Sequence, residues 1–94
     1  MPKLLAQIYA ESHPTRVVIQ LERPIAQLIV DDAIKEIGAS MRVGGTRFDV
    51  DFVGTNTIEI TGKNRRHTPA VLLKWAKSLA TQLGCEVKMV APPR

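Results

Sequence analysis

Residues 68–84 read TPAVLLKWAKSLATQLG, and no other stretch of the chain predicts its secondary structure as strongly. Thr68 is a suitable N-cap, and Pro69 suits the first helical position, where its missing N–H costs nothing. Gly84 follows the last apolar residue, as is common just after a helix C-terminus. We therefore predict a helix over 69–83 with a buried apolar stripe that contains Leu72, Trp75, Ala76, Leu79 and Leu83.

Alternating apolar and polar residues on either side of this helix predict strands. The five runs with this period-two pattern are 3–11, 15–22, 46–53, 57–61 and 85–90. The turn Ser12-His13-Pro14 separates the first two runs, and Gly54-Thr55-Asn56 separates the third from the fourth. Because these connections are short, each pair of runs is expected to form a hairpin.

A second helix is predicted over residues 24–37. Pro24 fits its first turn, and Gly38 is a plausible stop. A buried strand over 25–30 is the alternative, because periodicity alone cannot assign a short apolar run. The polar sequence over 31–36 favours the helix, and the apolar residues at helical spacing are Ile25, Leu28, Ile29, Ala33 and Ile37.

The order of these elements is ββαββαβ, which indicates an α+β fold. We expect a compact two-layer sandwich, in which a mainly antiparallel sheet carries both helices on one face and leaves the other partly open. A chain of 94 residues suffices for one hydrophobic core. We predict a single domain over 1–91 and a short C-terminal tail over 92–94.

Composition indicates the compartment. Cys85 is the only cysteine, so no intrachain disulfide can form. No run approaches the roughly 20 apolar residues of a membrane span, and the N-terminus lacks the apolar region of a signal peptide. We expect a cytoplasmic protein without a membrane partner.

The residues that commonly carry catalysis do not form a recognisable pattern. Cys85 has no partner at a familiar spacing and is expected to be a small buried hydrophobe. His13 and His67 lie in separate loops without carboxylates or cysteines at metal-ligand spacing. We therefore predict that the chain is not an enzyme and has no metal or cofactor. Three acidic residues could lie close together and bind a divalent cation or share a proton, but a solvated sheet face balanced by Arg47 is the expectation: Asp49, Asp51 and Glu59.

A basic segment precedes the helix that is predicted to begin at Pro69. Cations are mildly unfavourable at a helix N-terminus, because the helix dipole is positive there, whereas a bound phosphate would be stabilised. The alternative is a solvated loop without a ligand. The candidate anion-binding residues are those of the segment, two lysines of the helix and two arginines beside Gly44-Gly45: Lys63, Arg65, Arg66, His67, Lys74, Lys77, Arg42 and Arg47.

One local resemblance accompanies this segment. Residues 57–62, the basic loop and the apolar helix after it resemble the last strand and helix of a KH RNA-binding module. That family clamps nucleic acid with a G-x-x-G loop between two short helices. This chain has only Gly44-Gly45 after a single helix, so no site residue is taken from the family.

Two functions follow from these patterns. A net charge of +4 and a pI of about 9.6 favour acidic partners. The first hypothesis is a small non-catalytic domain that binds RNA, DNA or another polyanion through the phosphate backbone. The second is an interaction or regulatory subunit that docks on a protein partner, or on a second copy of itself, through a sheet face or edge strand.

Overall fold

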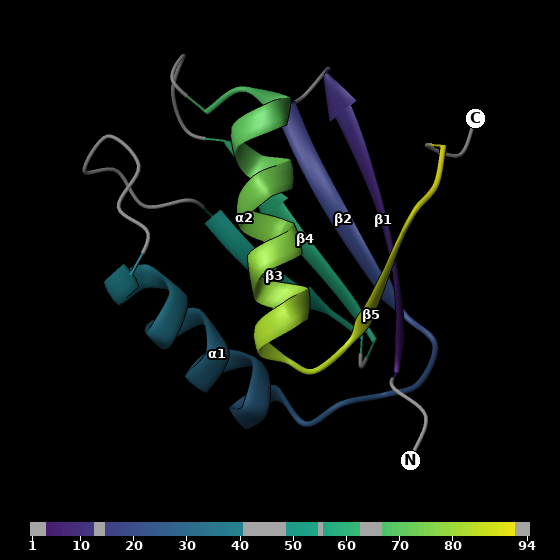
Figure 1. The fold of residues 1–94 in the computed structure, drawn as a ribbon, viewed down its shortest axis with the longest axis vertical. Coiled ribbons are helices and arrows are strands. Elements are labelled where there is room, and N and C mark those ends of the chain that lie inside the picture. The colour runs from purple at the N-terminus through teal and green to yellow at the C-terminus, as the bar shows by residue number, and fades with distance from the viewer. Residues whose placement is uncertain (1–3, 13–14, 41–48, 55, 63–66, 92–94) are drawn as a thin grey trace.

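The computed structural model contains one five-stranded sheet with two helices packed on it (Figure 1). It describes residues 4–12, 15–40, 49–54, 56–62 and 67–91. The elements follow the order ββαββαβ, and both helices lie on the same side of the sheet. The α+β class, the element order and the two-layer arrangement predicted from the sequence are confirmed.

The sheet has the strand order β3-β4-β2-β1-β5, so β3 and β5 form its edges. β1 pairs antiparallel with β2, β2 with β4, and β4 with β3, whereas β5 lies parallel to β1. Both predicted hairpins are therefore present, and the sheet is mainly antiparallel. The strands are β1 Leu5–Ser12, β2 Thr15–Leu21, β3 Asp49–Val53, β4 Thr57–Thr61 and β5 Glu86–Met89. The predicted start of the third strand, 46–48, lies outside the described residues.

Helix α2, Pro69–Gln82, has the predicted start and ends one residue early. The hydroxyl of Thr68 accepts a hydrogen bond from the Val71 N–H at 3.3 Å, which caps the first turn. Gly84 follows the helix with a φ of +77°, a conformation that favours glycine. Trp75 is buried, as predicted, whereas Leu83 is only half-buried.

Helix α1, Gln27–Ser40, differs from its prediction at both ends. It begins three residues after Pro24, because residues 22–26 form the connection from the end of β2 to the helical layer, and it continues past Gly38. Among its described side chains Val30 and Ala33 are buried, whereas Leu28 and Ile29 are 71% and 52% exposed. The predicted stripe was wrong at these two positions. Leu28, Ile29 and Val30 are consecutive apolar residues, so the sequence does not determine which of them faces the core. The side chain of Ile37, also part of the predicted stripe, lies outside those described.

The core lies between the sheet and α2. Inward residues of the central strands are fully buried because alternate residues of a strand face the same side. Each such side chain contributes on the order of 1.5–3 kcal/mol relative to an exposed one. The largest core side chains include Ile8, Ile19, Ile58, Ile60, Leu72 and Leu79. Neither described helix is long and apolar enough to cross a membrane.

Candidate functional site

The open face is the side of the sheet opposite the helices. Gln7 of β1 lies directly opposite Lys88 of β5 and Gln20 of β2, and Gln20 lies opposite Thr57 of β4. Directly paired residues share one face of a sheet. The register therefore lines up polar side chains from four adjacent strands, and we call these residues the polar row: Lys88, Gln7, Gln20 and Thr57.

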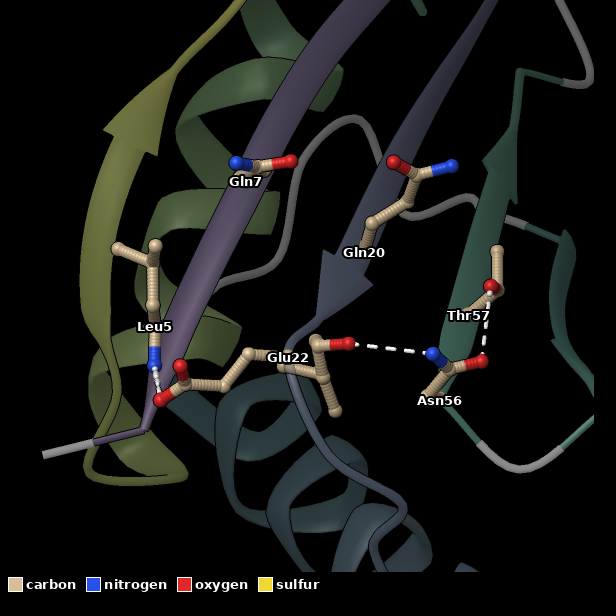
Figure 2. A pocket seen from close by; sticks show the side chains of 7 residues that line it. Leu5, Gln7, Gln20, Glu22, Asn56 and Thr57 are labelled. Atoms are coloured by element: carbon tan, nitrogen blue, oxygen red, sulfur yellow. Dashed lines mark hydrogen bonds between the residues drawn. The ribbon is translucent and has the colours of Figure 1, made fainter.

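A hollow of about 380 Å³ lies on the open face, and three residues of the polar row, Gln7, Gln20 and Thr57, line it. Figure 2 shows the carboxamides of Gln7 and Gln20 pointing toward one another from β1 and β2, with Thr57 beyond them on β4. Amide and hydroxyl groups can both donate and accept hydrogen bonds. The hollow is lined by Leu5, Gln7, Gln20, Leu21, Glu22, Asn56 and Thr57.

Hydrogen bonds hold the end of the hollow together (Figure 2). The Leu5 N–H donates to Glu22 Oε1 at 2.9 Å, which connects the start of β1 to the residue after β2. Asn56 Nδ2 donates to the Leu21 carbonyl at 3.2 Å, and the Leu21 N–H donates to the Asn56 carbonyl at 2.8 Å. These bonds connect the ends of three strands, so the hollow is formed before any ligand arrives.

The other half of the open face carries an ion-pair network. Arg16 contacts Glu11 at 2.7 Å and Glu59 at 3.3 Å, and all three side chains are roughly a quarter to a third exposed. The hydrogen bond that the Arg16 guanidinium donates to the Glu11 carboxylate is the main cause that raises the pKa of Arg16. Tyr9 and Val18 lie opposite each other between this network and the polar row, and both are buried.

Cys85 is not prepared for nucleophilic chemistry. Its side chain is 7% exposed, in keeping with the predicted small buried hydrophobe. Burial raises the pKa of the Cys85 thiol, and the negative charge of Glu22 raises it further. Reactive cysteines require the opposite shift, because the thiolate is the nucleophile.

The structure places only part of the predicted anion-binding set. Lys74 and Lys77 are exposed on α2, in the helical layer, and His67 is buried with 2% of its surface exposed. No group of three potential metal ligands occurs within the described ranges. The remaining predicted positions lie outside those ranges, so their role in binding an anion stays a prediction: Lys63, Arg65, Arg66, Arg42 and Arg47.

Comparison with known proteins gives matches to solved structures only. No known protein family matches the sequence, and no curated protein matches it. Two solved structures that match are of the essential ribosomal processing protease Prp from S. aureus, with a covalently linked product peptide in one and a substrate peptide in the other. They are 12% and 10% identical to this chain, with a TM-score of 0.45 in each case. Each match covers 95% of this chain and 99% of the other.

These matches correct the function predicted from composition. Both matched structures are of a protease with a bound peptide, whereas the sequence analysis predicted a non-catalytic domain for nucleic acid and no enzyme, so the comparisons do not support that prediction. The prediction depended on the basic segment ahead of α2, and Lys63, Arg65 and Arg66 of that segment lie outside the described residues.

Sequence reasoning missed the hollow and its residues. Alternation placed Gln7 and Gln20 on polar strand faces, but it could not pair them across strands. Pairing depends on register, which the turn between residues 12 and 15 sets. Asn56 had only a turn assignment, although its side chain connects β4 to the end of β2.

Proposed function

We propose that the open face binds an extended peptide segment of a protein partner, with the hollow as its centre. The observation that supports this proposal is the polar row. It places two carboxamides and one hydroxyl side by side on a surface that no described element covers. A partner laid across the row would meet a donor or an acceptor from each strand in turn.

The chemistry of the row suits a peptide backbone. A peptide presents alternating N–H donors and C=O acceptors, and each Gln carboxamide offers both kinds of partner. The sheet's own backbone groups are engaged in strand pairing at these positions. Side chains must therefore make the contacts, and Gln7, Gln20 and Thr57 are the ones within the hollow.

An extended segment fits the hollow better than a small molecule does. Small-molecule sites bury most of their ligand in a concave, mostly apolar pocket. Here the hollow lies open on one face of the sheet, and five of its seven lining residues are polar. A peptide that crosses the strands can continue beyond the hollow and cover Val18 and Tyr9 next to it.

We also propose the cytoplasm as the location of this interaction. Cys85 is the only cysteine of the chain and its thiol is free and buried. A protein of this size without a disulfide relies on its hydrophobic core for stability, which is usual in reducing compartments.

Selection from a displayed library of random peptides tests the binding proposal. We expect the wild type to retain peptides and the double variant Gln7→Ala/Gln20→Ala to lose most of them. NMR titration of a selected peptide should shift the resonances of the polar row. Mass spectrometry of the recovered peptide then distinguishes binding from cleavage.

Gln27→Ala is the matched control, because Gln27 is an exposed carboxamide at the start of α1, in the other layer. It should leave peptide retention unchanged. Both variants should unfold within about 1 kcal/mol of the wild type, because Gln20 and Gln27 are exposed and Gln7 is half-buried. Equal retention by the wild type and the Gln7/Gln20 variant would disprove the proposal.

A further inference from the structure

Strand β5 forms one edge of the sheet, beside β1 (Figure 1). The N–H groups of Glu86 and Val90 donate to backbone carbonyls on the β1 side at 2.8 and 2.9 Å. Successive residues of a strand direct their backbone groups to opposite sides, so Val87 and Met89 direct their N–H and C=O groups away from β1. Among the described residues no strand pairs with this outer side, so it can accept another strand.

Apolar side chains accompany these outward backbone groups. Met89 is 44% exposed, although it lies directly opposite the fully buried Ile8 of β1. Val87 lies opposite Ala6 and is half-buried against the core. Both side chains are therefore on the helical side of the sheet, at its margin. A strand paired along β5 would remove part of this apolar surface from water.

Opposite charges occupy the other face of the same strand. Glu86 and Lys88 are exposed, two residues apart, and neither has an ion pair with another described side chain. In an antiparallel copy that pairs Val87 with Val87, each Glu86 lies directly opposite the Lys88 of the second copy. Opposite charges in such positions stabilise an antiparallel pair.

The charges also select this register among its neighbours. Pairing must keep the outward groups of Val87 and Met89 facing the second copy, so the register can shift only in steps that preserve this. One step in one direction places Glu86 opposite Glu86, and one step in the other places Lys88 opposite Lys88. Like charges in those positions are destabilising, so the register centred on Val87 is favoured over both.

The opposite edge of the sheet lacks this complementarity. β3, Asp49–Val53, contains two acidic residues and no basic one. An antiparallel copy centred on the middle of β3 would place Asp51 opposite Asp51, which opposes pairing. Charges on an edge strand are a common means of preventing edge-to-edge association. Self-association of this chain therefore favours β5 over β3.

We infer that two copies of this chain form a two-fold symmetric dimer through an antiparallel β5–β5 pair centred on Val87. The two Val87 residues exchange N–H···O=C hydrogen bonds, and each Met89 N–H faces the Cys85 carbonyl of the second copy. The contact uses the same surface on both copies, so association closes at two. The two sheets become continuous, with both open faces on one side. Peptide binding by the open face is not needed for this contact.

Sedimentation velocity over a range of protein concentrations tests the dimer. We expect the wild type to self-associate. Glu86→Lys and Lys88→Glu should each raise the dimer dissociation constant by roughly 2- to 30-fold, because the two-fold axis makes each substitution change both ion pairs. The double variant Glu86→Lys/Lys88→Glu exchanges the charges and should restore association. These differences should shrink as salt rises.

Val87→Pro tests the backbone pairing directly. Proline is tolerated on an edge strand where the missing N–H faced solvent, so β5 should keep its pairing with β1 while the dimer is lost. In the wild type, the amide protons of Val87 and Met89 should exchange more slowly as protein concentration rises. Asp31→Lys on α1 and Lys77→Glu on α2 are the matched charge reversals at exposed positions and should leave association unchanged.

The outcomes that overturn the dimer are distinct. A wild type that stays monomeric at NMR concentrations contradicts it. A dimer that tolerates Val87→Pro and both charge reversals is held by another surface. Single reversals that weaken the dimer without rescue by the double variant contradict the register. Neither Glu86 nor Lys88 lines the hollow, so retention of a selected peptide tests the proposed function separately.

Discussion

Gly62 follows β4 in a position where a side chain has no room. Its N–H donates to the Thr15 carbonyl at 3.0 Å, so the backbone is held in the sheet. A Cβ added at Gly62 would lie 2.8 Å from the Cβ of His67 and 3.1 Å from its carbonyl oxygen. His67 is itself buried, so it cannot move aside freely.

Gly62→Ala should therefore destabilise the protein by about 1–3 kcal/mol, the usual cost of overpacking. Urea unfolding measures the change. Lys77→Ala, on the exposed side of α2, is the control and should stay within about 0.5 kcal/mol of the wild type. If Gly62→Ala is as stable as the control, the backbone at Gly62 and His67 must shift to accommodate the methyl group.

Cys85 supplies a prediction about pH. Burial raises the pKa of the thiol above its ordinary value of 9.0 in the folded protein, so the folded state retains the proton longer than the unfolded state does. The contribution to stability is therefore complete below about pH 9 and is lost as pH rises through the folded pKa.

The free energy of unfolding, measured from pH 7 to 10.5, should decline at the alkaline end in the wild type but not in Cys85→Ala. Alkylation of the thiol should also be slow until the protein unfolds, because the reactive thiolate is scarce. Rapid alkylation of the native protein at neutral pH would contradict the burial of Cys85.

At the scale of elements, the two helices show which local signals determine structure. The signals of α2 agree with one another: a capping hydroxyl at Thr68, proline at the first position, one apolar stripe and Gly84 after the end. The structure has each of them in place. The local signals of helix α1 do not agree in this way. Its apolar residues fit two faces, and its first residue is set by the length of the connection from β2.

Trp75 of α2 packs in the core between the helix and the sheet. Its side chain is 4% exposed within the core cluster. Trp75→Ala should destabilise the protein by about 3–5 kcal/mol, as large core truncations do. Thermal or urea unfolding gives the value, and a loss below about 1 kcal/mol would place the indole at the surface.

At the scale of the whole molecule, long-range pairing explains what the sequence could and could not predict. The strands were predictable because alternation is local. The order β3-β4-β2-β1-β5 and the parallel position of β5 were not, because they bring together residues far apart in the chain. The polar row depends on that pairing: Gln7 meets Lys88 only because β5 returns to the edge of β1.

The pairing of Asp51 on β3 with Glu59 on β4 can be tested through stability. Because Asp51 lies opposite Glu59, Asp51→Asn removes a like-charge repulsion and should raise the free energy of unfolding by roughly 0.2–1 kcal/mol. Asp and Asn are both poor strand formers, so propensity changes little. The gain should be larger at low salt than at high salt, because screening weakens the repulsion. Urea unfolding at two salt concentrations measures it, with Asp31→Asn on α1 as the control. A loss of stability in Asp51→Asn would mean that the carboxylate has a structural partner that outweighs its repulsion from Glu59.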